Sequence, residues 1–362
     1  MRDKLKIINF KCFKEQELVL SKLTVLVGSN GMGKSTVVQS LLLARAAKEM
    51  KDYAETVALN GPYGLELGTS ASVINQDVDS NSIQFIMRDD NDQLVYDITL
   101  EGSTEEERLD MKIRPAVIGS LEGIMYDEFY HLSAERNGPR ISQRMVPLDY
   151  LHTGIRGEHS AQILAKRHQK IDNNRLHPDV MTPYLIDHVN AWLNMILPGV
   201  ELTANEDTAM QTCQVKIRNK RAMDFVESTN IGFGISYALP IIIQGLVAEE
   251  GRYFIVENPE AHLHPSAQTR MGKFIAMLAD KGLHVVIETH SDHLLDGIQI
   301  YAATHRELKD DIIIYNFVQD NEFNVKVEPI TLDDDFDYSN WPDGFMDQTN
   351  KNYNEFVESR NL

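Results

Sequence analysis

Apolar and polar positions alternate at the start of the chain, and the spacing then changes. Over residues 4–20 roughly every second or third position is apolar, which predicts two strands of a hairpin. The apolar run 23–27 follows, with the β-branched valines typical of a buried parallel strand. Over residues 36–50 the apolar positions recur every third or fourth residue, as on one face of a helix. The pattern predicts a hairpin, a buried strand and a helix, in this order.

The middle of the chain predicts a second group of strands and then a helical segment. Residues 82–100 predict two strands separated by a polar turn, and an aromatic apolar strand within 126–146 leads into a polar loop. Residues 159–197 have helical spacing interrupted by two prolines. Residues 200–226 predict further strands. No heptad repeat continues for several turns, so a long coiled coil is not expected.

Strands and helices alternate in the last part of the chain. Helices are expected at 235–248 and 267–278, and each is followed by a short apolar strand, at 253–256 and 284–287. Alternation of this kind predicts an α/β fold with a largely parallel sheet. Ligands of such sheets bind outside the carboxyl ends of the strands. Three candidate residues fall at predicted strand ends, namely Gly28, Glu257 and His290.

The net charge of −19 over 362 residues narrows the class of partner. A protein that binds DNA over its whole surface needs a basic face, so nucleic acid is possible but is not the expected primary partner. No apolar run approaches the roughly 18 residues of a membrane helix. Two cysteines give no disulfide framework. We expect a cytoplasmic protein without membrane association.

The loop after the first buried strand has the pattern G-x-x-x-x-G-K-[ST] of a phosphate-binding loop. Lys34 would reach the β- and γ-phosphates, and the hydroxyl of Ser35 would bind Mg²⁺. A glycine-rich turn that binds nothing is the alternative, and the strand and helix on either side of the loop argue against it. GTP is disfavoured because Asn219-Lys220 lacks the aspartate of N-K-x-D. The residues predicted to contact nucleotide here are Ser29, Asn30, Gly31, Met32, Gly33, Lys34, Ser35 and Thr36.

Four motifs and the tail together resemble ABC-type P-loop ATPases of the SMC, RecF and OLD (overcoming lysogenization defect) kind. They are the Walker A loop at Gly28–Ser35, IGFGISYAL at Ile231–Leu239 in the signature position, YFIVENPEAHLHP at Tyr253–Pro265 as Walker B, IETHSDH at Ile287–His293 with the switch histidine, and a WPDGF-type tail. The resemblance implies an ABC-ATPase-like head with a mostly parallel P-loop core sheet, an antiparallel β lobe and a helical insertion.

The resemblance also implies four parts of the chain. Residues 1–139 would form an N-terminal ATPase lobe with Walker A and a β subdomain, and residues 140–226 a helical and β insertion. Residues 227–310 would hold the signature, Walker B and switch histidine. Residues 311–362 would be a C-terminal extension.

Residue roles follow from the same resemblance. Glu257, which ends an apolar strand expected next to the phosphate loop, would hold Mg²⁺ through water opposite Ser35. His290 would sense the γ-phosphate of ATP. Gly232 and Gly234 would bind the γ-phosphate presented by a second copy. The implied assembly is a head-to-tail homodimer that encloses two ATP molecules with Mg²⁺.

One position departs from the family pattern D-E-P-E. Asn258 stands where the family has the glutamate that activates water, and an amide cannot accept a proton. Glu260 and Glu288 are the alternatives for that role, and the catalytic candidates are therefore Glu257, Asn258, Glu260 and His290. We expect slow ATP hydrolysis and a long-lived ATP-bound dimer.

The leading hypothesis is a dimeric nucleotide switch that regulates or recruits a separately encoded effector, a nuclease or toxin, as in bacterial anti-phage systems. The alternative is a RecF-like DNA-repair ATPase that clamps DNA directly. A metal site built from His262, His264, His290 and His293 is disfavoured by their spacing. The basic stretch 136–144 is expected on a solvated face. Within it, Arg136 and Arg140 could also couple the nucleotide site to the second lobe, contact phosphate or form a structural salt bridge.

Overall fold

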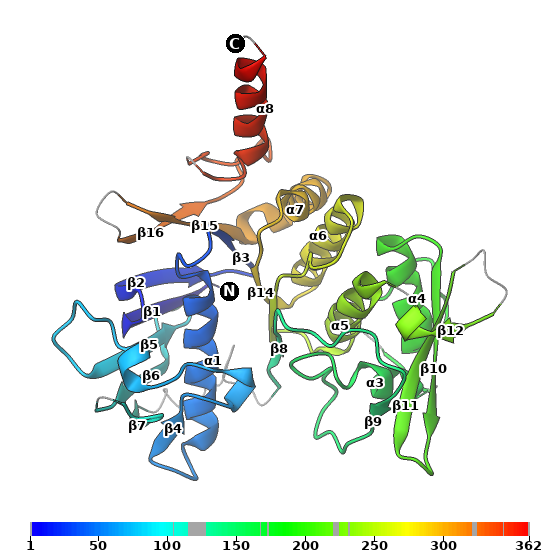
Figure 1. Ribbon diagram of the computed structural model, residues 1–362, viewed down its shortest axis with the longest axis horizontal. Coiled ribbons are helices and arrows are strands. Elements are labelled where there is room, and N and C mark those ends of the chain that lie inside the picture. Colours follow the sequence, from blue (N-terminus) through cyan, green and yellow to red (C-terminus); the bar gives the residue numbers. More distant parts are fainter. Residues whose placement is uncertain are drawn as a thin grey trace.

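The computed structural model describes most of the chain, and it contains three β-sheets (Figure 1). The described residues are 2–103, 105–114, 128–166, 168–171, 174–219, 224–230, 232–320, 324–342 and 344–360. Four features discussed above lie partly outside these residues. They are Ile231 of the signature stretch, residues 220–222 of the segment compared with N-K-x-D, the start of the strand expected within 126–146, and one residue of the WPDGF tail.

The central sheet is mostly parallel, with the strand order β16-β15-β3-β14-β13-β8. All of its strand pairs are parallel except β15–β16. Strands β3, β13 and β14 are buried on both faces, which explains their continuous apolar sequences. The predicted P-loop core sheet is therefore confirmed. The bounds are β3 Leu23–Gly28, β8 Tyr130–Leu132, β13 Tyr253–Glu257, β14 His284–Glu288, β15 Ile312–Gln319 and β16 Val325–Ile330.

A second sheet, antiparallel throughout, forms the predicted β lobe with the order β2-β1-β5-β6-β7-β4. Helix α1 (Lys34–Met50) packs between this sheet and the central one, because Val37 and Leu41 share an apolar cluster with Leu5 of β1 and Leu26 of β3. The bounds are β1 Asp3–Phe10, β2 Phe13–Leu20, β4 Thr56–Ala58, β5 Ser82–Arg88, β6 Leu94–Glu101 and β7 Arg108–Arg114, with the short helices η1 Pro62–Gly64 and α2 Ser70–Val73.

The predicted insertion forms a small third sheet with helices, on the opposite side of the central sheet from the β lobe in Figure 1. Its elements are β9 Gln143–Arg144, α3 Ser160–Ala165, α4 Leu185–Ile196, β10 Val200–Asp207, β11 Thr212–Asn219, β12 Val226–Glu227 and η3 Ser228–Asn230. Helix α4 packs against α5 (Phe233–Val247), so the insertion is attached to the helix that begins at the predicted signature stretch. Helices α6 (Pro265–Asp280) and α7 (Asp292–Thr304) follow β13 and β14.

The last fifty residues begin inside the core. Strand β15, the first element of the predicted C-terminal extension 311–362, pairs with β3 in the central sheet. Helix η4 (Arg306–Asp311) precedes it, and helix α8 (Gln348–Ser359) projects from the body (Figure 1). The four-part division of the chain stays a prediction. No helix in the described ranges is long and apolar enough to cross a membrane.

Two glycines allow α6 and α7 to approach until their backbones touch. A Cβ on Gly272 would lie 2.1 Å from the carbonyl oxygen of Leu294, and one on Gly297 would lie 2.0 Å from that of Thr269. Real Cβ atoms do not come this close to backbone oxygen, so any side chain at either position would push the helices apart. The contact fixes the start of α7, where His290 and Ser291 lie, against α6.

We expect Gly297→Ala to lower the free energy of unfolding by about 1–3 kcal/mol, the usual cost of overpacking a close contact. The better helix propensity of alanine, worth up to about 1 kcal/mol, offsets only part of this loss. Urea unfolding measures the effect. Ala303→Ser on the exposed side of α7 is the control and should stay within about 0.5 kcal/mol of wild type. An equally stable Gly297→Ala protein would contradict the close helix contact.

Candidate functional site

The loop between β3 and α1 adopts a conformation that depends on glycine. Gly28, Gly31 and Gly33 all have positive φ angles, of 128°, 78° and 95°. A Cβ on Gly28 would lie 2.2 Å from the carbonyl oxygen of Phe317 in β15, and one on Gly33 would lie 2.8 Å from the Sγ atom of Cys12. The loop therefore fits closely between β15 and the β1–β2 turn and ends at the amino end of α1, where free N–H groups favour anions.

Lys34 spans this loop from the inside. Its Nζ atom donates to the carbonyl oxygens of Gly28 and Ser29, at 2.9 and 2.8 Å, and the side chain is only 3% exposed. Burial lowers the pKa of Lys34, and the charge of Glu288 opposes this shift. Among the described residues no carboxylate lies within ion-pair distance of it. A buried ammonium without a charged partner is costly, and a phosphate group would relieve that cost.

The carboxylate that contacts the Ser35 hydroxyl is Glu288, at 2.9 Å. The sequence placed the strand of Glu257 next to the phosphate loop, and this is wrong, because β14 lies between β3 and β13. Glu288 ends β14 and pairs in register with Glu257 at the end of β13. Burial raises the pKa of Glu288, and the negative charges of Glu257 and Glu260 raise it further, against the Ser35 hydrogen bond and Lys34.

Glu257 instead contacts strand β8. Its Oε1 atom lies 2.9 Å from Nε2 of His131, and its Oε2 atom accepts a 3.4 Å hydrogen bond from the backbone N–H of Ala134. Sequence reasoning missed His131, which lies in an ordinary apolar strand without a motif. The role of Glu257 as a magnesium ligand stays a prediction.

Several buried acceptors at this edge have no hydrogen-bond partner among the described residues. They are Oε2 of Glu288, Oε2 of Glu260 and Oδ1 of Asn258. Buried oxygens are normally satisfied, so this group calls for donors or a cation. A hydrated Mg²⁺, which prefers one or two carboxylates plus waters and phosphate oxygens, fits it. No group of three or more His, Cys, Asp or Glu able to hold a metal on its own exists within the described part of the chain.

Asn258 and His290 complete the edge. Asn258 has a φ of 45°, a region that asparagine tolerates, and its N–H donates to the carbonyl of Glu288 at 2.8 Å. The backbone N–H of His290 donates to Oε1 of Glu260 at 2.9 Å. Desolvation and the positive charge of Lys34 lower the pKa of His290, and Glu260 opposes them. This shift favours the neutral imidazole, which can donate one hydrogen bond.

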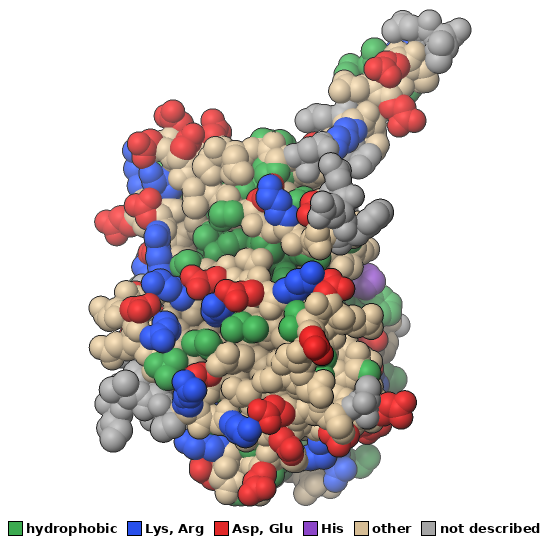
Figure 2. Space-filling view, turned by 90° about the vertical axis from the view of Figure 1, so that its left-hand side faces the viewer, with side chains coloured by type: hydrophobic (Ala, Val, Ile, Leu, Met, Phe, Trp, Pro, Cys, Tyr) green, Lys and Arg blue, Asp and Glu red, His purple; other side chains and the backbone are tan. Residues whose placement is uncertain are grey.

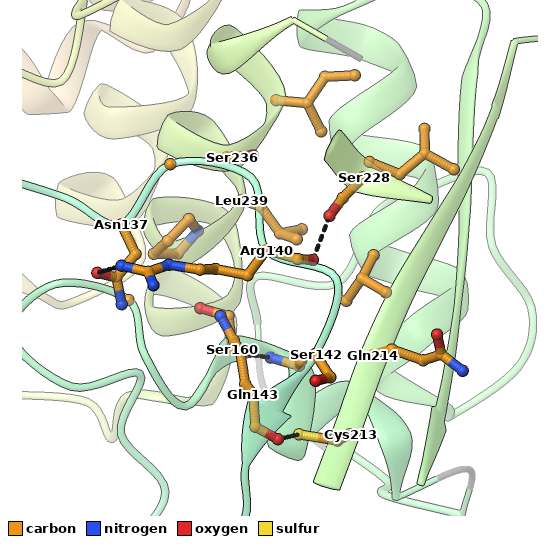
Figure 3. Close-up of a pocket in the computed structure, with 17 residues that line it drawn as sticks. Asn137, Arg140, Ser142, Gln143, Ser160, Cys213, Gln214, Ser228, Ser236 and Leu239 are labelled. Carbon is orange, nitrogen blue, oxygen red and sulfur yellow. Dashed lines mark hydrogen bonds between the residues drawn. The ribbon is translucent and has the colours of Figure 1, made fainter. Parts of the chain in front are cut away.

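Arg136 lies beneath this edge and not on a solvated face, which corrects the expectation for the stretch 136–144. It is 4% exposed, and its Nη atoms donate to the carbonyl oxygens of Glu257 and Asn258, at 2.7 and 2.5 Å. Carbonyls just past a strand end lack partners in the sheet, so a buried donor is needed there. Arg140 does extend along the surface, toward Asn137 (Figure 3).

The predicted signature glycines, Gly232 and Gly234, lie at the amino end of α5. Gly232 is the N-cap, without a side-chain cap, and a Cβ on it would meet nothing within 4 Å. A Cβ on Gly234 would lie 2.8 Å from the carbonyl oxygen of His262. Phe233 between them is 54% exposed. Within the described residues, the atoms nearest to these two Cβ positions include none of the phosphate loop.

A small pocket separates the first turns of α5 from the insertion. Its volume is about 50 Å³, and β11, α3 and the loop of Arg140 form its other walls (Figure 3). Ser228 donates to the carbonyl of Arg140 at 2.6 Å, which ties this loop to the insertion. No phosphate-loop or Walker B residue lines the pocket, so it lies outside the candidate site.

The comparisons with known proteins agree with this geometry. Residues 23–296 match the family described as "AAA domain, putative AbiEii toxin, Type IV TA system". No curated protein sequence matches the chain.

Two solved structures share the fold. One is the Smc head bound to the C-winged helix domain of ScpA, with 12% identity and a TM-score of 0.55 over 92% of this chain and 98% of that one. The other is an Smc head with an extended coiled coil bound to the C-terminal domain of ScpA derived from Pyrococcus furiosus, with 12% identity and a TM-score of 0.53 over 98% and 99%. They support the ABC-ATPase-like head predicted from the sequence.

The matched range contains the phosphate loop, the two glutamates at the strand ends and the start of α5. The specific branch suggested by ENPEAHLHP and the WPDGF-type tail stays a prediction. The chain belongs to this family of AAA-domain proteins, and its fold is that of an ABC-type P-loop ATPase head of the SMC kind.

Proposed function

We propose that the protein is an ATP-dependent switch in which two copies close on two ATP molecules, and that the closed dimer regulates or recruits a separately encoded effector. One observation carries the proposal. The phosphate loop and its carboxylates would supply half of a nucleotide site. At the amino end of α5, a Cβ on Gly232 would meet no described residue within 4 Å, and one on Gly234 would lie nearest to His262 and Leu263 and not to the phosphate loop.

The first half of the site would be supplied within one chain. Lys34 would turn from the carbonyls of its loop to the β- and γ-phosphates of ATP, and Ser35 and Glu288 would hold Mg²⁺. Glu257 would hold a water of the same ion, and His290 would donate to the γ-phosphate. Bound Mg²⁺ would neutralise charge on the phosphates.

The second half would come from the other copy. The first N–H groups of α5 have no partner within the helix, and their positive end favours an anion such as a γ-phosphate. Phe233, a large apolar side chain exposed at this helix end, is typical of a surface that a partner covers.

Hydrolysis would be slow. The side chain of Asn258 can orient a water molecule through its unpartnered Oδ1 atom but cannot accept the proton. Glu260 lies close enough to influence Glu288, but its Oε1 atom is engaged by the N–H of His290. ATP would thus act mainly by being bound, and the dimer would last until hydrolysis opened it.

The effector is inferred from the description of the matched family and from the partners bound in the similar structures. The matched family is described with a toxin, and both similar Smc heads were solved with a ScpA domain bound. Helix α8 offers a surface for such a partner, because it projects from the body with Tyr353, Phe356 and Val357 exposed. A role in anti-phage defence belongs to the same proposal.

Direct clamping of DNA, the RecF-like alternative, has less support. The face seen in Figure 2 mixes Lys and Arg with Asp and Glu and has no continuous basic stripe. With the net charge of −19, the phosphate contacts that dominate DNA affinity would be few. Tight binding of plain duplex DNA by the isolated protein at physiological salt would favour the alternative.

The assembly test uses Gly232→Arg, since no described residue lies within 4 Å of a Cβ at this position and a long side chain should disturb only the partner. Wild type should become dimeric with ATP and Mg²⁺ by light scattering. Gly232→Arg should bind ATP and stay monomeric, and Lys34→Ala should not bind ATP. Ala303→Arg on α7 is the matched surface control and should dimerise. Wild type that stays monomeric at saturating ATP would contradict the switch.

The magnesium test compares two carboxylates. We expect Glu288→Gln to raise the Mg²⁺ concentration needed for tight ATP binding by about 10- to 100-fold, and Glu257→Gln to raise it less, because only Glu288 contacts Ser35. Since the pKa of Glu288 is raised, Mg²⁺-dependent binding in wild type should weaken on acidification at a pH above the usual range of a glutamate. Titration by nucleotide fluorescence measures both. Equal effects of the two variants would contradict the assignment.

The turnover test places glutamate, the residue of the family pattern, at position 258. Asn258→Glu should increase the steady-state ATPase rate by about 10²- to 10⁴-fold, the usual contribution of a general base. Asn258→Ala is the control and should stay as slow as wild type. The φ of 45° should cost Asn258→Glu some thermal stability, so rates are compared below its unfolding range. Wild-type turnover at tens per second would disprove slow hydrolysis.

A further inference from the structure

Arg136 joins the end of the Walker B strand to the helix that starts at Gly232. Its Nη1 and Nη2 atoms hold two consecutive carbonyls, those of Glu257 and Asn258, and Nη1 also donates to the carbonyl of Ser133 at 3.2 Å. Since one rigid guanidinium makes these bonds, it fixes the direction in which Glu257 and Asn258 leave the strand.

The same guanidinium lies over the ring of Tyr237 in α5, 5.1 Å from its centroid. Tyr237 meets the edge of the His262 ring at 4.5 Å, and Phe233, one turn earlier in α5, lies 5.4 Å from the same imidazole. We call Phe233, Tyr237 and His262 the α5 aromatic cluster. Contacts therefore run without a break from the carboxyl end of β13 through Arg136 to the exposed start of α5.

This position of Arg136 is energetically expensive. Burial lowers the pKa of Arg136 to about 10, and its buried Nε atom has no hydrogen-bond partner among the residues that the structure describes. Among the described residues its guanidinium contacts neutral carbonyls and a ring, and no carboxylate lies within ion-pair distance. A structural salt bridge, one of the roles open from the sequence, is therefore not what holds it. Contact with phosphate is also disfavoured, because the guanidinium is already engaged by carbonyls and by Tyr237.

We propose that Arg136 is a positioning residue that couples the nucleotide site of one chain to the α5 surface that meets the other chain. A shift of Glu257 and Asn258 on ATP binding moves the two carbonyls, and Arg136 passes this shift to Tyr237 and the first turn of α5. The coupling is reciprocal, so pressure of a partner on α5 acts back on Asn258. The assignment rests on the proposed ATP switch.

The test distinguishes the planar guanidinium of Arg136 from its positive charge, and the aromatic ring of Tyr237 from its hydroxyl group. Arg136→Lys keeps a cation but cannot hold two carbonyls and cover the ring at once. Tyr237→Leu removes the ring, and Tyr237→Phe keeps it. All are made in the full chain, and three quantities are measured: ATP affinity of the monomer, ATP-driven dimerisation, and hydrogen exchange of residues 233–237 with and without ATP at concentrations where the protein is monomeric.

We expect Arg136→Lys and Tyr237→Leu to weaken dimerisation by about 5- to 150-fold, the usual size of a coupling between sites, and to weaken monomer ATP affinity by much less. Tyr237→Phe should resemble wild type. The double variant Arg136→Lys/Tyr237→Leu should be no weaker than the worse single one, because both break one path. ATP should slow exchange at 233–237 in wild type and not in Arg136→Lys.

Two outcomes overturn the inference. Arg136→Lys could weaken monomer ATP affinity as much as dimerisation, which would make Arg136 a mere support of the pocket. ATP could also slow exchange at 233–237 equally in wild type and Arg136→Lys. The exchange measurement does not depend on dimerisation. A wild-type protein that binds ATP but never dimerises would refute the proposed switch, and the exchange result would still show whether Arg136 couples the nucleotide site to α5.

Discussion

Parallel neighbours in a sheet end at the same edge, and the whole site depends on this constraint. With β14 between β3 and β13, the phosphate loop, Glu288 and Glu257 end side by side. The Ser35–Glu288 hydrogen bond joins the first helical turn to the middle strand. Several of the resulting polar atoms are buried without hydrogen-bond partners in the described part of the chain. They stay clustered because the buried apolar strands beneath them cannot shift register without exposing their side chains.

The sequence predicted much of this arrangement because its signals are local. The glycine pattern of the phosphate loop, the apolar strands and the helical spacing after residues 231 and 267 correspond to β3, α1, α5, β13, α6 and β14. Strand order is not a local property. The sequence around Glu257 or Glu288 does not show which strand lies next to β3, so the strand beside the phosphate loop was predicted incorrectly.

Arg136 shows a second limit. An arginine in a polar loop is normally solvated, and the chain around it has no apolar pattern that would indicate burial. What buries it is the need of two carbonyls at the end of a distant strand, together with an aromatic ring in α5. Such a need arises only once the fold brings residues more than a hundred positions apart into contact. The contact of His131 with Glu257 was not predicted from the sequence for the same reason.

The contact between Gly272 and Gly297 has a mechanical consequence. Helices α6 and α7 touch through their backbones, and Ser291 at the start of α7 also donates to Gln268 of α6 at 2.6 Å. The two helices therefore form one rigid body that cannot slide along its interface. His264 caps the amino end of α6, and Ser291, the neighbour of His290, caps that of α7. The loops after β13 and β14 are therefore attached to the same rigid body. A displacement that starts at either loop must tilt both together.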